Sequence, residues 1–321
     1  MRIAAFDDAG ARRYGLIRGE RIHPLPPEAD LFAMLDDIHD EQRILTACSD
    51  PRSLGAVRLL TPVRPSTVRD FVTFEEHVEG VRRSLDNAVG VPDQWYVAPT
   101  FYFTNPYSIL GPADDVPVPP GCQAFDFELE VAAVIGRPGR DLTPEQAREN
   151  IVGYTIMNDW SARDLQQAEM RVGLGPAKGK DTSTTLGPWL VTADELEPYR
   201  NTDGFLDLAM TAQINGQVVG RDRLSHMGWT FEEMVAYSSR GTWVRPGDVL
   251  GSGTCGNGGC LAELWGRNGA HTPPALQPGD VVTLTVEGIG TLSSTVIPGS
   301  TPIAISSARN RLVDRRSRAR S

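Results

Sequence analysis

The sequence predicts an α+β protein that is mostly β, with a small N-terminal domain and a larger C-terminal body. Short apolar stretches punctuated by Gly and Pro dominate the 321 residues, and helix-start signals are few. Prolines at 62 and 65 separate the first sixty residues from the rest. A chain of this length with 40% hydrophobic residues can bury a sizeable core. We expect domains at residues 1–62 and 66–300 and a basic, disordered tail at 304–321.

The N-terminal domain is predicted to combine short strands with two helices. The segments MRIAAF, YGLIRG and ERIHPL, at residues 1–6, 14–19 and 20–25, have the composition of strands separated by turns. Two stretches at 29–38 and 41–47 follow with helical character.

The body is predicted to hold many strands and few helices. Residues 127–135 alternate as a strand, and residues 281–286 and 291–297 flank a Gly-Ile-Gly turn typical of a hairpin. Thr73, Thr143 and Thr230 are each followed three residues later by Glu or Gln, the capping-box pattern that starts a helix. The pattern is that of a mostly β body carrying a few helices.

Charge and composition exclude several classes of function. The net charge is −10, and the tail at 309–321 holds six Arg and one Asp, so the remaining body is strongly acidic and we expect no nucleic-acid partner. No apolar run approaches the roughly 20 residues of a membrane span, and the N-terminus lacks the pattern of a secretion signal. We therefore expect a cytoplasmic protein with no membrane partner. Four scattered cysteines predict no disulfide framework, and Cys255 and Cys260 lack the second pair that a structural zinc site needs.

Glu128 and Glu130 are the first candidate site residues. In an extended strand both side chains point to one face, since side chains alternate with period two. A solvated face is the simpler interpretation. However, the strand continues with apolar residues on both faces, which indicates burial on both. Two buried carboxylates need a cation to offset repulsion and desolvation, and oxygen ligands suit Mg²⁺, Mn²⁺ or Ca²⁺.

A second cluster of polar residues follows the strand pattern at 151–157. Polar residues begin abruptly at Asn158, at the point where the strand is predicted to end. Catalytic groups often lie on such loops, although an ordinary turn that caps the next helix would look the same. The polar side chains are Asp159, Arg163, Asp164 and Gln166.

His77 lies at the edge of the apolar stripe of the helix predicted after Thr73. A lone histidine in such a place is most often a hydrogen-bonded structural residue. It could also act as a general base, because the reference pKa of histidine lies near neutrality.

Taken together, these elements resemble the fumarylacetoacetate hydrolase family over residues 65–298. The matching motifs are an Asp seven residues before a His, ExE after VPVPPG, NDWSARDLQ, a lysine-containing stretch ending in LGPW, PGDVLGSGT, and a late Glu in GGCLAEL. The resemblance implies a mixed β-roll or β-sandwich body with a small N-terminal domain. It also implies a small-molecule substrate and a homodimer.

The resemblance implies a divalent-metal site, most naturally for Mg²⁺. Glu128, Glu130 and Asp159 match the metal-binding carboxylates of the family, and Asp70 matches the fourth one found in its hydrolase branch. His77 matches the water-activating base, and Glu263 matches the acid that orients it. The oxyanion positions match Arg163, Gln166 and one lysine, which stays open between Lys178 and Lys180. Tyr102 and Thr254 match substrate-side positions.

Two residues depart from the pattern of the animal fumarylacetoacetate enzyme. Met170 stands where that enzyme has a substrate-binding Tyr, and Asp86 stands where it has an Arg. The resemblance therefore implies a substrate other than fumarylacetoacetate itself. Gly80 replaces the Glu of the HxxE pattern common in decarboxylating and isomerising members, which favours the hydrolase branch.

Three hypotheses follow for the function. The leading one is a metal-dependent hydrolase that cleaves a C–C bond in a small 1,3-dicarbonyl acid, fumarylacetoacetate- or acylpyruvate-like. The second is a decarboxylase or an isomerase/tautomerase of a 2-keto acid such as oxaloacetate at the same metal site. The third is a binding protein that has lost catalysis, against which every matched metal and catalytic position is still occupied by a competent residue.

Overall fold

A twelve-stranded mixed sheet runs through the protein in the computed structural model, which describes residues 1–34, 40–86 and 88–309. Two strands lie off its main path, β5 (Leu59–Leu60) beside β1 and β8 (Ile109–Leu110) beside β15. The main path follows the order β4 (Arg52–Ser53), β3 (Arg21–Pro24), β2 (Ala11–Arg18), β1 (Arg2–Asp8), β15 (Thr184–Thr192), β13 (Ile151–Asp159), β11 (Leu129–Ile135), β19 (Val249–Gly251), β6 (Val68–Phe71) and β7 (Phe101–Thr104).

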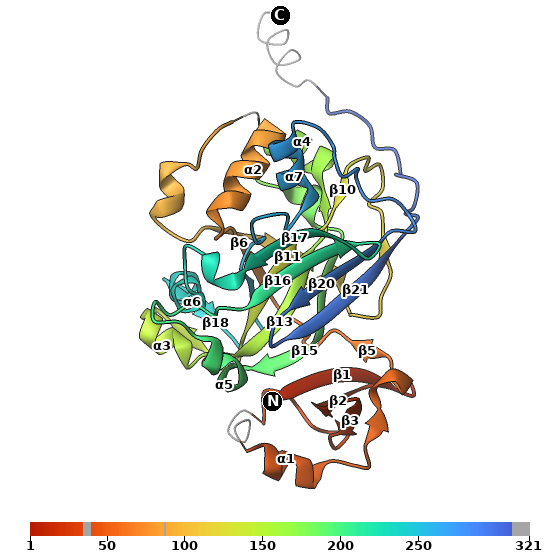
Figure 1. The fold of residues 1–321 in the computed structure, drawn as a ribbon, viewed down its shortest axis with the longest axis vertical. Coiled ribbons are helices and arrows are strands. Elements are labelled where there is room, and N and C mark those ends of the chain that lie inside the picture. The colour runs from red at the N-terminus through yellow and green to blue at the C-terminus, as the bar shows by residue number, and fades with distance from the viewer. Residues whose placement is uncertain (35–39, 87, 310–321) are drawn as a thin grey trace, which may run out of the picture.

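A second sheet of five strands packs on one face of the first (Figure 1). It includes the predicted hairpin, which is confirmed as β20 and β21. Two short pairs complete the β structure: β10 (Phe125–Asp126) with β14 (Ser161–Ala162), and β12 (Gly139–Arg140) with β18 (Trp243–Val244). The order of the second sheet is β17 (Gln217–Arg223), β16 (Ala209–Ile214), β20 (Val281–Val286), β21 (Gly290–Ile297) and β9 (Val116–Pro117).

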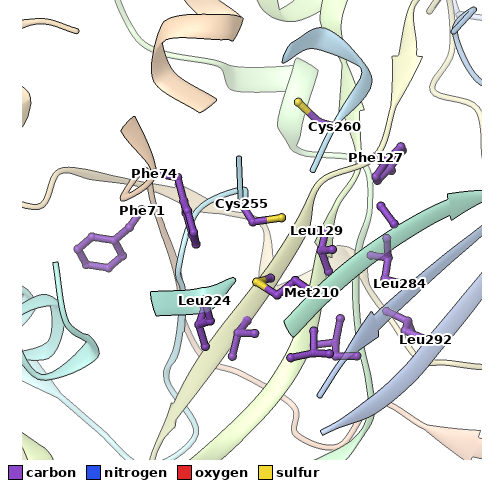
Figure 2. Close-up of a cluster of buried hydrophobic side chains, with 14 of the residues drawn as sticks. Phe71, Phe74, Phe127, Leu129, Met210, Leu224, Cys255, Cys260, Leu284 and Leu292 are labelled. Atoms are coloured by element: carbon purple, nitrogen blue, oxygen red, sulfur yellow. The ribbon is translucent and has the colours of Figure 1, made fainter. Parts of the chain in front are cut away.

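The main hydrophobic core fills the space between the two sheets. Leu129 of β11 belongs to it together with Met210 and Leu284 of the second sheet, as Figure 2 shows. The opposite face of β11 presents Ala132 and Val134 to a second apolar cluster, which the N-terminal strands share. All seven residues of β11 are buried, so the prediction of a strand buried on both faces is confirmed.

Three helices gather at one end of the large sheet: α2 (Glu75–Asp86), α4 (Arg163–Met170) and α7 (Leu261–Asn268) (Figure 1). The helices α3 (Pro144–Arg148), α5 (Ala193–Leu196) and α6 (Phe231–Ser239) lie elsewhere on the body. Capping boxes at Thr143 and Thr230 are confirmed. The predicted N-cap at Thr73 is wrong by one residue, because its hydroxyl donates to the carbonyl oxygen of Ser252 and α2 begins at Glu75. The 3₁₀ turns are η1 (Leu54–Ala56), η2 (Asp93–Tyr96), η3 (Pro106–Ser108), η4 (Ala177–Lys180), η5 (Glu197–Tyr199) and η6 (Leu224–His226).

The N-terminal strands extend the body sheet, since β1 pairs antiparallel with β15. Helix α1 (Glu41–Ala47) is confirmed with Asp40 as its N-cap. Residues 31–34 form turns where a helix over 29–38 was predicted, and residues 35–39 lie outside the described part of the chain. Residues 304–309 have no regular structure, and the rest of the basic tail lies outside the described part of the chain. No described helix has the length and apolarity to cross a membrane.

Gly153 allows β13 and β15 to approach closely in the centre of the sheet. A Cβ atom there would lie 2.2 Å from the carbonyl oxygen of Val191. We expect Gly153→Ala to lower the free energy of unfolding by about 1–3 kcal/mol, because the backbone of β15 must move. Urea unfolding measures this loss. Gly55→Ala is the control, since only one atom lies within 4 Å of the added Cβ and no change above about 0.5 kcal/mol is expected. An equal loss in both variants would contradict the packing argument.

Candidate active site

Five neighbouring strands of the large sheet bring polar residues to one end of the sheet. In the order β13-β11-β19-β6-β7, each strand contributes the terminus that lies at this end, because β11 starts where β13, β19 and β6 finish. Register pairs Asp70 of β6 with Tyr102 of β7 and with Gly251 of β19. Asp159 closes β13, and Glu130 lies at the start of β11. Strand pairing alone therefore collects four polar side chains and one glycine from five strands.

Four carboxylates form a buried cluster at this end, namely Asp70, Glu128, Glu130 and Asp159, each at most 4% exposed. Oxygen atoms of the first three lie within 4.8 Å of one another. Asp159 joins them through Tyr102, whose hydroxyl lies 2.7 Å from Oδ2 of Asp70 and also contacts Oδ2 of Asp159. A phenol has one proton to donate, so it cannot satisfy two carboxylates at once. The cluster lacks enough hydrogen-bond donors for its oxygens.

The geometry of this carboxylate cluster fits a divalent cation. Oδ1 of Asp70 and Oε1 of Glu130 have no hydrogen-bond partner among the described residues. Gly251 lets these carboxylates approach the backbone of β19 closely, because a Cβ atom there would lie 2.7 Å from Oε2 of Glu130 and 2.9 Å from Oδ1 of Asp70. Unpaired buried carboxylate oxygens gathered in one cluster are what an oxygen-liganded metal requires. The cluster is a candidate divalent-metal site.

Burial and mutual repulsion shift the titration of the cluster. Burial first, and neighbouring carboxylates second, raise the pKa of Asp70 and of Glu130 well above the usual range. Burial also raises the pKa of Asp159. Burial opposes ionisation of Glu128 as well, but Lys180 and Arg163 outweigh it and hold the pKa of Glu128 below its usual value. Without a bound metal ion, some carboxylates of the cluster must retain their protons at neutral pH.

Lys180 is the lysine that the structure places against the carboxylates. Its Nζ lies 2.5 Å from Oε2 of Glu128 and 2.6 Å from Oδ2 of Asp159, and the side chain is 4% exposed. Gly179 makes this possible, because a Cβ atom there would lie 2.7 Å from the backbone of Gln166 in α4. Lys178, the other predicted lysine, is 64% exposed and pairs with Asp181 on the surface. The tight turn of η4 directs Lys178 and Lys180 to opposite sides, so Lys178 does not reach the carboxylates.

Arg163 lies buried in the first turn of α4 and joins the cluster to two other elements. Its Nη2 donates to Oε1 of Glu128 at 2.6 Å, and its Nε donates to Oδ2 of Asp126 at 2.8 Å. Its Nη1 donates to Oε1 of Gln166, one turn further along α4. Asp126 also accepts hydrogen bonds from the backbone N–H groups of Leu261 and Ala262 at the start of α7. Arg163 and Asp126 thus fix the positions of α4 and α7 relative to the carboxylates.

His77 of α2 is 6% exposed and close to the cluster. Burial lowers the pKa of His77 to about 3, so its ring is neutral at pH 7. Its Nδ1 lies 3.6 Å from Sγ of Cys260, the N-cap residue of α7. The predicted partner, Glu263, is directed elsewhere: its Oε1 lies 2.6 Å from Nη2 of Arg267, four residues along α7. Glu263 therefore pairs with Arg267 in its own helix and not with His77. Burial raises the pKa of Glu263 to about 7.

A pocket of about 380 Å³ opens beside the cluster. Its lining combines the polar groups of the cluster with the apolar side chains of Val78, Val81 and Trp95, and it also includes Arg82. The hydroxyl of Thr254 is buried without a hydrogen-bond partner among the described residues, which leaves it able to bind a ligand. Met170 is 40% exposed at the rim. The predicted site residues that line the pocket are Asp70, His77, Tyr102, Glu128, Arg163, Gln166, Met170, Lys180 and Thr254.

Three residues of the site were missed by reasoning from the sequence. Asp126 precedes Glu128 by two residues in FDFELE, so the period-two argument could have found it. Cys260 precedes Glu263 by one helical turn, and its contact with His77 comes from packing of α2 on α7. Gly251 is recognisable only from the strand order, since its role is to let Asp70 and Glu130 lie close to the backbone of β19.

Comparison with known proteins agrees with this geometry. The family described as "Fumarylacetoacetate (FAA) hydrolase C-terminal" matches residues 66–297. A fumarylacetoacetase of Oryza sativa subsp. japonica is 29% identical, with 81% of this chain and 74% of the relative covered. The mitochondrial oxaloacetate tautomerase fahd2 of Xenopus laevis is 31% identical, with 68% of this chain and 62% of the relative covered.

The fold is also shared with solved structures. The fumarylacetoacetate hydrolase of the psychrophile Exiguobacterium antarcticum superposes with a TM-score of 0.72 at 27% identity, covering 93% of this chain and 99% of the other. The mostly β fold class predicted from the sequence is thereby confirmed. With the family match extending over most of the chain, the protein belongs to the fumarylacetoacetate hydrolase family.

Proposed function

We propose that this protein is a metal-dependent hydrolase that cleaves a C–C bond in a small 1,3-dicarbonyl acid of the fumarylacetoacetate or acylpyruvate class. The observation that carries the proposal is the cluster of four buried carboxylates with unpaired oxygens, adjacent to two buried cations and a neutral histidine. Acyl transfer to water from a carbon leaving group needs these kinds of group together: a cation site, oxyanion donors and a base.

Asp70, Glu128, Glu130 and Asp159 would hold the metal. Carboxylate oxygens suit Mg²⁺, Mn²⁺ and Ca²⁺, and the family resemblance favours Mg²⁺ among them. A bound cation would supply Lewis-acid polarisation of the substrate oxygens and stabilise negative charge on the departing carbon.

The remaining residues have roles that follow from where they lie. Neutral His77 has a ring nitrogen free to take the proton from water, whose oxygen then bonds to the carbonyl carbon. Lys180 and Arg163 hold positive charge beside the developing oxyanion. The C–C bond breaks, and the carbon that keeps the electron pair takes up a proton. An acylpyruvate would give a carboxylic acid and pyruvate.

The lining of the pocket limits the substrate class only in part. Val78, Val81 and Trp95 line it and would contact an apolar acyl substituent. Arg82 also lines it and carries a charge that could bind a second carboxylate. We infer that an alkyl acyl group and an acyl group with an acidic end both suit this lining.

A second reaction at the same site is tautomerisation or decarboxylation of a 2-keto acid such as oxaloacetate. The observation that favours it is the partner of His77: Nδ1 faces a thiol, and Glu263 pairs with Arg267 instead. A histidine without a carboxylate partner is less suited to activating water. The similarity to a named oxaloacetate tautomerase supports the same alternative.

Product analysis tests the leading proposal. Protein with Mg²⁺ and an acylpyruvate bearing an alkyl acyl group should yield pyruvate and the matching carboxylic acid by mass spectrometry. A chelator should abolish the reaction, because the carboxylates hold the cation. His77→Ala should lower the rate by about 10²–10⁴ if the histidine is the base.

Two results would replace this proposal. Enolisation of oxaloacetate, or its conversion to carbon dioxide and pyruvate, with acylpyruvates left intact would establish the second reaction. Full hydrolysis by His77→Ala would remove the histidine from its assigned role.

Lys180 and Lys178 form a matched pair of variants. Lys180→Met should reduce kcat by about 10²–10³, the usual effect of losing an oxyanion-stabilising group. Lys178→Met should leave kcat within about twofold, because its side chain is in solvent. Circular dichroism checks that both variants are folded, since removing one partner of a buried ion pair can destabilise by about 3–5 kcal/mol. Equal kcat values for two folded variants would contradict the assignment.

The metal site predicts an unusual dependence of stability on pH. The pKa values of Asp70 and Glu130 are raised in the folded protein, so above about pH 6.5 the folded state binds more protons than the unfolded state. Stability of the metal-free protein should therefore fall as pH rises from 6.5 to 8. His77 opposes this fall near pH 6.5, because the unfolded chain still partly protonates it and the folded protein does not, and it contributes little by pH 8.

Mg²⁺ should reverse this loss, and by more at pH 8 than at pH 6.5. A concentration one hundred times the Kd adds about 2.7 kcal/mol to the free energy of unfolding. Thermal unfolding with Mg²⁺ or chelator at both pH values measures the effect. Asp70→Asn should reduce both the pH dependence and the response to Mg²⁺, and an unchanged response in this variant would contradict the ligand assignment.

A further inference from the structure

A second set of potential metal ligands lies beside the four carboxylates. A ring nitrogen of His77, Sγ of Cys260 and a carboxylate oxygen of Glu128 all lie within 4.8 Å of one another. All three residues are buried, and each comes from a different segment of the chain. This thiol-containing set differs chemically from the carboxylate cluster, because sulfur and imidazole nitrogen prefer Zn²⁺ and similar ions to Mg²⁺.

The spacing of the set fits a tetrahedral ion. Zinc takes nitrogen at about 2.0–2.1 Å and sulfur at about 2.3 Å, which puts two tetrahedral ligands roughly 3.6 Å apart. Nδ1 of His77 and Sγ of Cys260 are 3.6 Å apart in this structure. Glu128 accepts one hydrogen bond on each oxygen, from Arg163 and from Lys180, and each oxygen has a second lone pair. The three ligands therefore need little rearrangement.

We propose that His77, Cys260 and Glu128 form a binding site for a thiophilic divalent cation such as Zn²⁺, separate in ligand chemistry from the carboxylate cluster. Three protein ligands leave a fourth position for water, facing the pocket that His77 and Glu128 line. On binding, the Cys260 thiol loses its proton to solvent and no group changes its oxidation state. The local excess of carboxylates attracts the dication.

Occupancy of this site inhibits the enzyme, and this consequence rests on the proposed function. A neutral imidazole has one nitrogen with a free lone pair, and the other carries the proton. When the ion takes that lone pair, His77 can no longer accept a proton from water. The ion also engages Glu128, which the carboxylate cluster needs for its own metal. Zn²⁺ is thus expected to act at low concentration even when Mg²⁺ is saturating.

Cobalt provides a readout that does not require turnover. Co²⁺ added to the full chain in saturating Mg²⁺ should give a thiolate-to-cobalt charge-transfer band in the near ultraviolet at one equivalent per chain, and Zn²⁺ should remove it. Cys260→Ser should abolish the band. Serine suits the N-cap position of α7, so this variant is expected to fold. Cys255→Ser is the matched control, since Cys255 is also buried in the segment before α7, and it should keep the band.

Asp70→Asn separates the two sites, because Co²⁺ bound by carboxylates alone gives no thiolate band. This variant should keep the band, and Cys260→Ser should weaken inhibition by Zn²⁺ at least tenfold. Absence of the band in the unmodified chain, its persistence in Cys260→Ser, or its loss in Asp70→Asn would each overturn the proposal. If no substrate is ever hydrolysed, the proposed function fails while the band still decides the metal site.

Discussion

The excess of buried negative charge at one end of the large sheet is the constraint on which the rest of the site depends. Five carboxylates, including Asp126, lie there against two buried cations, Lys180 and Arg163. Such a set is stable only if protons or a metal ion offset the repulsion and the desolvation cost. Two glycines permit this close packing: Gly251 lets Asp70 and Glu130 approach the backbone of β19, and Gly179 lets Lys180 approach.

The same ionic contacts also join elements that are distant in sequence. Asp126 accepts hydrogen bonds from Arg163 in α4 and from the first N–H groups of α7, so a single carboxylate fixes both helix termini beside the sheet. Cys260 caps α7 and faces His77 of α2. The positions of the proposed base, the proposed oxyanion donors and the candidate metal ligands are consequently interdependent, because the three helices that carry or border them are in direct contact.

Members of this family with one carboxylate arrangement can differ in reaction through the groups around it. Hydrolysis needs an activated water, whereas tautomerisation needs only proton transfer to and from carbon. In this chain the groups beside the carboxylates include the thiol at Nδ1 of His77 and, in the pocket lining, Arg82 among apolar side chains. The proposed affinity for softer ions depends on this thiol, because a carboxylate partner would not provide it.

The sequence by itself determined the mostly β fold, the buried strand β11, the capping boxes at Thr143 and Thr230, and the pairing of Glu128 with Glu130 on one face, because these depend on local periodicity and spacing. Asp70 and Asp159 entered the predicted metal site through the family resemblance. Tertiary structure decided which lysine meets the carboxylates, since the two differ only in the direction that a tight turn gives them. It also decided that Glu263 pairs with Arg267, that Thr73 bonds to Ser252, and that β1 joins the body sheet. Each of these outcomes is a competition between partners from different segments, and spacing along one chain carries no information about which partner prevails.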